Sequence, residues 1–404
     1  MSVVTLFSGV FCSEDEVVQD IIESTGYQHI NDDKVVLEAS EFSNISKEIL
    51  RRSFSSKTSV FNRFTQEKER SAAFLRLAAA RLIQQDNVVL SGFSGHLIPK
   101  ILTHVIRVLL IAKSSYRRST ASQKQNFSDN EAEQFILMDD HQRSEWVKQL
   151  HGINDPWDKN LYDIVIPMDT TNTAKAAALI KSYLYDQTME ISDSSNDLVR
   201  DFILACEVET ALAAAGHIVK VEAEKGAVSL IMNQQVLMLG RLEKELKSIV
   251  EGIPGVESVN TRVEKNLHEN HSYRRYNFDM PSKVLLVDDE REFVQTLSER
   301  LQMREMGSVV AYDGPSALEL VRNDEPEVMI VDLKLPGMDG MEILDQVKQI
   351  NSDIEVIILT GHGSEQDREK CLELGAFAYM QKPVDISTLS QTLKQAHEKI
   401  RTGH

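Results

Sequence analysis

The chain has 404 residues, of which 42% are hydrophobic and 26% are charged, and its formal net charge is -18. A composition of this kind indicates folded domains, and the length favours two or three of them over a single one. The acidic surplus argues against binding to nucleic acid or to anionic membrane surfaces. No apolar run approaches the roughly 20 residues that a membrane span needs.

The first residues, Met1–Cys12, are apolar but follow no basic residue and lead directly into three acidic residues. This pattern indicates a first strand and not a signal peptide, so we expect a cytoplasmic location. The cysteines are too far apart for a disulfide framework or a metal site, and we expect them to be buried thiols in a reducing compartment: Cys12, Cys206 and Cys371.

Residues 1–186 form the first predicted domain. Short apolar runs alternate with helical stretches here, which predicts an α/β domain with buried parallel strands. The predicted strands are Val3–Phe7, Val88–Leu90, Ile106–Ile111 and Ile164–Ile166, and the predicted helices include Ser71–Gln84 and Ala174–Tyr183. The polar stretch that follows, Gln187–Asn196, is predicted to be a linker.

Four stretches of this domain resemble the cytidylate-kinase-like family of P-loop nucleoside monophosphate kinases: VVTLFSG (3–9), VVLSGFSG (88–95), HVIRVLLIAKSSYRRS (104–119) and YDIVIPMDTTNTAKAAALI (162–180). The resemblance implies a P-loop-kinase-like α/β fold. A working P-loop has the pattern G-x-x-x-x-G-K-[ST], in which backbone amides and the lysine hold the phosphates. Aligned on Gly9, this chain has Glu14, Asp15 and Glu16 at the last three positions. Carboxylates there repel a triphosphate, so the P-loop is predicted to be degenerate and without nucleotide kinase activity.

Two further positions bear on this domain. Arg117 and Arg118 stand where the kinase family has lid arginines that contact phosphate, but without a working P-loop we expect a solvated basic turn. The domain then either binds a nucleotide without turning it over or serves as a protein-binding surface. The alternative is a phosphorylation-regulated nucleoside monophosphate kinase of the cytidylate type, which would need an unconventional phosphate site.

Residues 197–265 form the second predicted domain. The predicted order is helix Leu198–Ala215, strands Val219–Glu224 and Ala227–Asn233, helix Leu237–Val250 and strand Glu257–Val263. The segments DLVRDFILACEVETAL, IVKVEAEKGAVSLIMN and GIPGVESVNTRV resemble the BON domain family, which implies a small α+β module that binds other molecules. Its histidine, His217, is isolated, and we expect it at the surface or in a turn. The following segment, Asn266–Met280, is predicted to be a second linker.

Residues 281–404 form the third predicted domain, in which strand and helix alternate five times. The predicted strands are Lys283–Val287, Val309–Tyr312, Glu327–Val331, Glu355–Leu359 and Ala376–Met380. Five such strands predict a doubly wound sheet, whose ligand site lies at the carboxyl ends of the strands. Several charged and polar residues follow the predicted strands at this edge: Asp288, Asp289, Asp332, Thr360 and Lys382.

Three converging carboxylates repel each other unless a cation lies among them, and Mg²⁺ is the hard cation that such oxygen ligands favour. A carboxylate beside that ion can attack a phosphoryl donor and form an aspartyl phosphate, while a lysine neutralises the developing charge. A strand-end Asp alone is more often a helix cap, and Lys-Pro is usually a loop. The combination of all five residues at one edge favours the chemical interpretation.

The segments VLLVDDE (284–290), VMIVDLKLPGMDGMEIL (328–344), VIILTGHGS (356–364) and AFAYMQKPV (376–384) resemble the response-regulator receiver family across this whole domain. The resemblance implies a flavodoxin-like (βα)5 fold. It also implies that Asp332 accepts the phosphoryl group, that Asp288 and Asp289 join it in holding Mg²⁺, that Thr360 is the switch hydroxyl and that Lys382 contacts the phosphate. Tyr379 stands at the family's aromatic switch position, and half-buried packing is the alternative for it.

The chain is therefore predicted to be a response regulator of a two-component phosphorelay. A sensor histidine kinase would phosphorylate Asp332, and phosphorylation would switch the interactions of the kinase-like and BON-like domains with an output protein that the sequence does not identify. Homodimerisation is common in the family and is expected to be one mode of assembly. A passive phosphate sink without an output is the third hypothesis.

Overall fold

A computed structural model describes residues 2–85, 87–184, 193–233, 239–264, 277–361 and 363–402. The chain forms two compact units. The first consists of residues 1–58 and 67–274, and the second of residues 59–66 and 275–404. The predicted linkers, Gln187–Asn196 and Asn266–Met280, lie for the most part outside the described residues.

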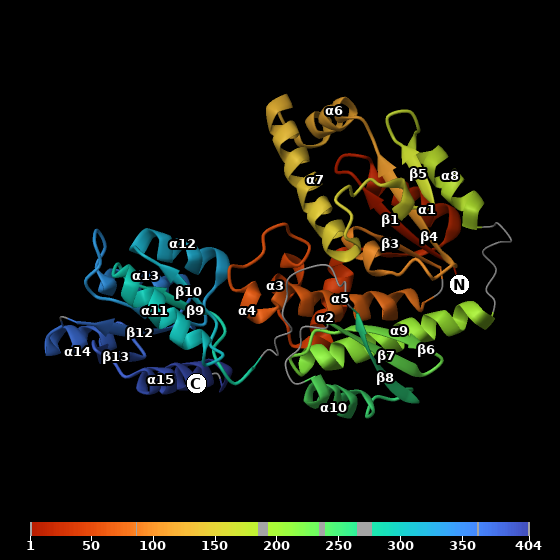
Figure 1. The fold of residues 1–404 in the computed structure, drawn as a ribbon. Helices are drawn as coiled ribbons and strands as arrows, with labels where there is room; N and C mark the ends of the chain where they lie inside the picture. Colours follow the sequence, from red (N-terminus) through yellow and green to blue (C-terminus); the bar gives the residue numbers. More distant parts are fainter. Residues whose placement is uncertain are drawn as a thin grey trace. The chain divides into compact units, whose positions relative to one another are not determined.

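The first unit contains a five-stranded parallel sheet with the order β2-β3-β1-β4-β5 (Figure 1). Its strands are β1 (Val3–Ser8), β2 (Gln28–Ile30), β3 (Val88–Ser91), β4 (Val105–Ile111) and β5 (Ile164–Pro167). The central strand β1 is buried along its whole length, as expected for a strand that helices cover on both faces. The four predicted strands are confirmed. The short edge strand β2 was not predicted, because three residues carry no periodicity to detect.

Helices cover both faces of this sheet. Apolar residues of α1 (Glu14–Thr25) and α8 (Thr173–Leu184) pack on one face. The other face is covered chiefly by α5 (Glu67–Ile83), which is joined in the same apolar cluster by residues of neighbouring helices. The remaining helical elements of this region are α2 (Asp32–Ser43), α3 (Lys47–Arg52), η1 (Phe93–Leu97), α6 (Ser114–Gln125), α7 (Asp129–His151) and η2 (Lys159–Leu161).

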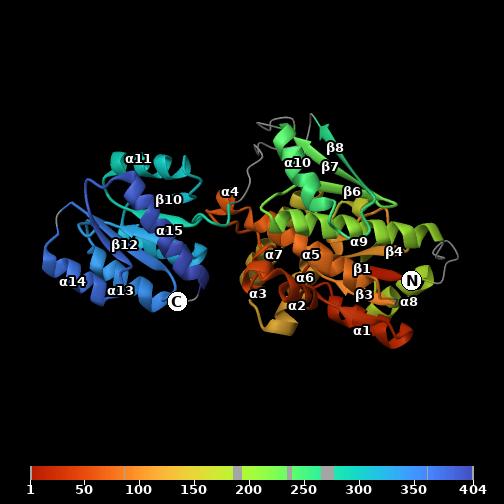
Figure 2. The same ribbon diagram turned by 90° about the horizontal axis from the view of Figure 1, so that it is seen from below.

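The middle part of the chain belongs to the same unit. Helix α9 (Asp193–Ala214) lies along α5 (Figure 2) and is followed by a three-stranded sheet of β6 (Lys220–Glu224), β7 (Ala227–Asn233) and β8 (Ser258–Glu264), with α10 (Leu239–Val250) before β8. β6 pairs with β7 antiparallel, and β7 pairs with β8 parallel. The predicted order of elements is confirmed, whereas the likeness to the BON family stays a prediction. His217 directly follows the turn at Ala215 and Gly216, but its side chain is buried near Glu245, so the surface alternative for it was wrong.

The second unit contains another five-stranded parallel sheet, with the order β10-β9-β11-β12-β13. Helices α11 and α15 cover one face, and α12, α13 and α14 cover the other. The strands are β9 (Val284–Val287), β10 (Ser308–Ala311), β11 (Val328–Val331), β12 (Glu355–Thr360) and β13 (Ala378–Gln381), and the helices are α11 (Arg291–Gln302), α12 (Gly314–Asp324), α13 (Gly340–Ile350), α14 (Glu365–Glu373) and α15 (Ile386–Thr402). This is the predicted flavodoxin-like, doubly wound fold.

Residues 59–66, which we call the clasp, leave the first unit and complete the second. The clasp contains the short helix α4 (Asn62–Thr65). Phe61 is 0% exposed and lies in the apolar layer beneath α12 and α13. The Val60 amide donates a hydrogen bond to the Asp324 carboxylate at 3.0 Å. Gly307 permits close approach, since a Cβ there would lie 2.6 Å from the Phe64 Cβ. No sequence pattern predicted this contact, because it joins residues more than two hundred positions apart.

Within the described residues, none of the helices combines the length with the low charge that a membrane crossing requires.

Candidate functional site

Three carboxylates meet at the carboxyl ends of two adjacent strands in the second unit. Asp288 and Asp289 follow β9, and Asp332 follows β11. The two strands are paired so that Val287 lies opposite Val331, which brings the residues after them to the same level. One oxygen from each carboxylate lies within 4.8 Å of the others. Asp288 is 4% exposed and Asp332 is 6% exposed, whereas Asp289 faces solvent.

Lys382, which follows β13, reaches across to this cluster. Its ammonium lies 2.6 Å from an Asp288 oxygen, 2.9 Å from an Asp332 oxygen and 3.2 Å from an oxygen of Glu290. Burial lowers the pKa of Lys382, but its hydrogen bonds to Asp288 and Asp332 outweigh burial and raise that pKa overall. Burial raises the pKa of Asp288 by more than its hydrogen bond to Lys382 lowers it. The peptide bond between Lys382 and Pro383 is cis.

The donor set suits a hard divalent cation. The three clustered carboxylates and Glu290 have one ammonium, that of Lys382, among them, which leaves a formal surplus of negative charge at the site. The raised pKa of Asp288 indicates that one lysine does not fully compensate its burial. Mg²⁺ binds through a few carboxylates and keeps other positions for water and phosphate oxygens. The residues present therefore fit Mg²⁺.

Two residues on the neighbouring strands adjoin the cluster. Thr360 ends β12 and is fully buried, and its carbonyl accepts a hydrogen bond from the Lys382 amide. Tyr379 lies half-buried on β13, with its hydroxyl over Gly363. A Cβ at position 363 would overlap that hydroxyl, so glycine is required for this position of the ring. The Tyr379 hydroxyl is buried and has no hydrogen-bond partner among the described residues.

Sequence reasoning did not single out two other residues at the site. Glu290 contacts Lys382 and donates its amide proton to Asp288 Oδ1 at 2.9 Å. Gly340 begins α13, and a Cβ there would lie 2.3 Å from the carbonyl oxygen of Asp332. Two features of the sequence could have indicated these residues: the acidic run from Asp288 to Glu290 and the Gly-Met-Asp-Gly segment that leads into α13.

The degenerate P-loop of the first unit is filled by protein side chains. The Arg117 guanidinium donates to the carbonyl of Val10 at 2.9 Å and forms two hydrogen bonds, of 2.8 and 2.7 Å, with Asp140. A Cβ at Gly9 would lie 3.2 Å from the Arg117 guanidinium carbon. The solvated turn expected for Arg117 was therefore wrong, because the side chain is buried in an ion pair. Arg118 is partly exposed and pairs with Asp129 at 2.9 Å.

Two carboxylates occupy positions around the same loop. Glu14 begins α1 and accepts a hydrogen bond from Ser8. Asp32 accepts the amide protons of Phe93 and Ser94 at 2.9 and 2.8 Å. Burial raises the pKa of both carboxyl groups despite these hydrogen bonds. Glu14 and Asp32 thus lie beside a loop whose sequence lacks the lysine of a P-loop.

Two family models match this chain. The response regulator receiver domain matches residues 284–394, and the cytidylate kinase-like family matches residues 3–170. Among curated proteins, sporulation initiation phosphotransferase F of Bacillus subtilis (strain 168) is 35% identical over 116 residues, which is 29% of this chain and 94% of that protein.

Solved structures of receiver domains are also similar to the C-terminal part. One, from Clostridium thermocellum, is 31% identical and covers 30% of this chain and 98% of its own, with a TM-score of 0.29. Another, a CheY-like protein from Methanospirillum hungatei JF-1, is 25% identical and covers 30% of this chain and 97% of its own, with a TM-score of 0.29.

Proposed function

Because the chain belongs to the response regulator receiver family through its C-terminal part and carries a cytidylate kinase-like domain before it, we propose that it is a phosphorelay protein phosphorylated on Asp332. A sensor histidine kinase is the proposed donor. The observation that carries the proposal is the position of Asp332. It is a buried carboxylate 2.9 Å from the Lys382 ammonium, beside two more carboxylates that can share a cation.

The proposed reaction uses an oxygen of Asp332 as the nucleophile. One oxygen attacks the phosphorus of a phosphohistidine, a P–O bond forms as the P–N bond breaks, and the departing imidazole takes up a proton. Lys382 contacts Asp332 Oδ2 and is positioned to neutralise charge on the arriving phosphoryl oxygens. The amide of Lys334 lies 3.3 Å from Asp332 Oδ1 and orients the carboxylate. The Thr360 hydroxyl is the proposed hydrogen-bond donor to the bound group.

Asp288, Asp289 and Asp332 would hold Mg²⁺, which when bound supplies positive charge next to the phosphoryl oxygens. Asp288 and Asp289 thus have a binding role in this proposal. Asp332 both binds the ion and reacts.

The test is labelling of the full chain by acetyl phosphate in the presence of Mg²⁺. We expect a single phosphoryl group by intact mass, lost on treatment with hydroxylamine because it is an acyl phosphate. Asp332→Asn is expected to abolish the label. Asp345→Asn, an exposed carboxylate on α13, is the matched control and should label like the wild type. Undiminished labelling of Asp332→Asn, or a label resistant to hydroxylamine, would refute the assignment.

The proposed output is a change of contacts in the other domains. The apolar layer beneath α12, α13 and α14 contains Phe61 of the clasp, and Tyr379 packs against the same layer. Movement of Tyr379 on phosphorylation would therefore disturb the packing that holds the clasp. The clasp continues directly into α5 of the kinase-like domain at Glu67. This continuity supports a signal that passes from Asp332 into the first unit.

Nucleotide kinase activity has weaker support. The family match favours the fold, but the loop at Gly9 lacks the lysine and is filled by Arg117 and Asp140. We propose that the kinase-like domain and the BON-like segment act as docking modules. In this proposal, these modules bind a separate protein partner or a second copy of the chain.

A further inference from the structure

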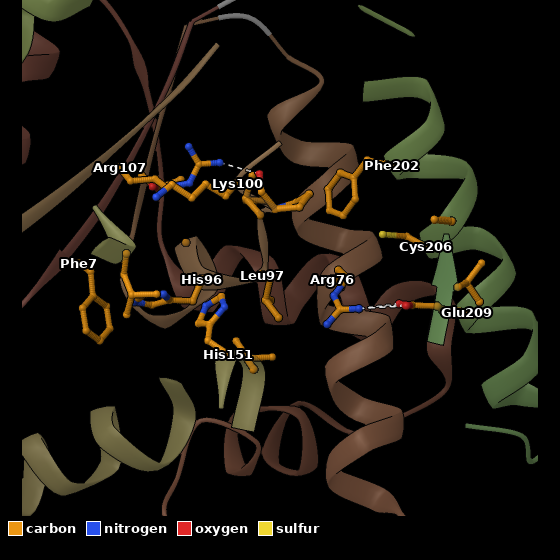
Figure 3. A pocket seen from close by; sticks show the side chains of 18 residues that line it. Phe7, Arg76, His96, Leu97, Lys100, Arg107, His151, Phe202, Cys206 and Glu209 are labelled. Carbon is orange, nitrogen blue, oxygen red and sulfur yellow. Dashed lines mark hydrogen bonds and ion pairs between the residues drawn. The ribbon is translucent and has the colours of Figure 1, made fainter. Parts of the chain in front are cut away.

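A cavity of about 400 Å³ lies in the first unit, apart from both the receiver site and the filled P-loop. Its walls come from the sheet, from α5, from the end of α7 and from α9, so that the kinase-like and middle parts of the chain share it (Figure 3). Apolar side chains form much of the lining: Phe7, Leu97, Leu150 and Phe202. A cavity of this size lies within the range that proteins use to enclose small organic ligands.

The charged side chains of the lining are mostly cationic. They are Arg76, Lys100 and Arg107, with Glu209 as the lone carboxylate among the lining residues that the structure describes. Glu209 is committed to Arg76 through hydrogen bonds of 3.0 and 2.9 Å, visible as dashed lines in Figure 3. That pair is neutral. The balance of charge at the cavity is therefore set by Lys100 and Arg107.

These two cations are bound largely by groups without formal charge. Lys100 donates to the backbone carbonyl of Asn160 at 2.7 Å, and Arg107 donates to the carbonyls of Pro99 and Val105 at 2.6 and 2.9 Å. Asp163, outside the lining, forms an ion pair with Arg107 at 3.5 Å, so the positive surplus at the cavity comes from Lys100. In a chain with a net charge of -18, this cavity keeps a positive surplus that attracts anions.

Two imidazoles add uncharged hydrogen-bonding groups. His96 and His151 lie edge to face, with ring centroids 5.3 Å apart. Burial, and then the neighbouring His151, lower the pKa of His96 to about 3, and burial also lowers the pKa of His151. Both rings are neutral near pH 7, so each has one donor and one acceptor nitrogen, and His96 Nε2 already shares a hydrogen bond with the Tyr162 hydroxyl at 3.3 Å.

We propose that this cavity binds a small aromatic anion, a flat ring system that carries one carboxylate, sulfonate or phosphate group. The ring would lie among Phe7, Phe202 and Leu97, and its anionic group would face Lys100 and Arg107. Because α5 and α9 both form the wall, an occupant would tie the middle part of the chain to the kinase-like domain. The protein would then receive a chemical signal separate from phosphorylation of Asp332.

Anilinonaphthalene sulfonate is the probe for the test, and phenylnaphthylamine, which has the same rings without the sulfonate, is its neutral counterpart. Titration of the full chain with the sulfonate should give a saturable, one-to-one rise in fluorescence that excess benzoate reverses. Phenylnaphthylamine should bind more weakly. Lys100→Met should weaken sulfonate binding roughly fivefold, as expected for loss of one partly exposed charge. Lys47→Met, an exposed lysine on α3, should have no effect.

Ala205→Phe locates the site, because Ala205 lines the cavity and a phenyl ring there would fill it. We expect this variant to lose the signal while keeping the thermal unfolding midpoint of the wild type. If Ala205→Phe lowers the thermal unfolding midpoint, Ala205→Leu, which adds less volume, is used in its place. Three results would each overturn the proposal. They are binding of phenylnaphthylamine as tight as that of the sulfonate, wild-type binding by Lys100→Met, and full binding by a stably folded Ala205→Phe or Ala205→Leu variant.

Discussion

At the scale of single residues, the receiver site depends on one lysine that balances buried carboxylates. Lys382 contacts Asp288 and Asp332, whose side chains are almost inaccessible to solvent. Removing one partner of a buried ion pair leaves the other charge uncompensated, which typically costs about 3 to 5 kcal/mol. A bound cation could replace the lost charge, so stability and metal binding should be linked at this position.

Lys382→Met is expected to lower the free energy of unfolding of the second unit by about 3 kcal/mol in the presence of a chelator. Mg²⁺ should recover part of this loss, so the rise in Tm on adding Mg²⁺ should be larger in the variant than in the wild type. Thermal unfolding with EDTA and with Mg²⁺ measures both effects. Lys394→Met, an exposed lysine on α15, is the control and should show the wild-type response. An unchanged Mg²⁺ effect in Lys382→Met would contradict the linkage.

At the scale of elements, the clasp shows how a short segment can complete a distant core. Phe61 enters the layer beneath α12 and α13, and Asp324 at the end of α12 fixes the backbone at Val60. The clasp meets the amino end of β10, whereas Asp332 lies at the carboxyl end of β11. The clasp and the acidic site therefore lie at opposite ends of the parallel sheet, and the apolar layer that contains Phe61 lies between them.

Phe61→Ala should destabilise the second unit by about 3 kcal/mol, since a fully buried phenyl ring is lost. It should also speed hydrogen exchange of the amides in residues 59–66. Val60→Ala is the matched control, because this side chain is 41% exposed and its hydrogen bond uses the backbone. If residues 59–66 of the wild type exchange at the rate of an unfolded peptide, the clasp is not packed on the second unit in solution.

The same exchange measurement tests the proposed signal. Phosphorylation should change the protection of residues 59–66 in the wild type and leave it unchanged in Asp332→Asn. Equal protection with and without the phosphoryl group would show that the clasp does not transmit the signal. It would not contradict the structural role of Phe61 in the second unit.

At the scale of the whole molecule, a cytidylate kinase-like sheet is combined with a loop at Gly9 that lacks the P-loop lysine. The parallel sheet and its covering helices are supported by apolar packing that does not depend on a nucleotide. The space over Gly9 is taken by Arg117 and its partner Asp140. Because a fold does not by itself determine an activity, the predicted absence of nucleotide kinase activity is compatible with this architecture.

The full chain is therefore expected to form no CDP from CMP and ATP above the rate without protein. Chromatographic detection of CDP provides the measurement, and a cytidylate kinase assayed in parallel is the positive control. CDP formation by the wild type that is lost in Arg117→Ala would contradict this expectation and favour an unconventional phosphate site.

The sequence alone determined much of the receiver. Its five predicted strands begin and end within a residue or two of β9 to β13. The signal is strongest for β11 and β12, whose runs of Val, Ile and Leu are typical of strands covered on both faces. Asp288, Asp332 and Lys382 were predicted to converge from their places after strands, since parallel strands present their carboxyl ends at one edge. Their roles in phosphorylation stay predictions.

Only the tertiary structure decided the remaining features. The burial of Arg117 against Asp140, the insertion of Phe61 into a distant core and the cavity between α5 and α9 all depend on contacts between segments far apart in the chain. Local periodicity reports which face of an element is apolar, but not which partner covers it. The sequence likewise does not show which charged side chains pair with each other. Arg117 was predicted to be solvated, but the fold places the Asp140 carboxylate beside it.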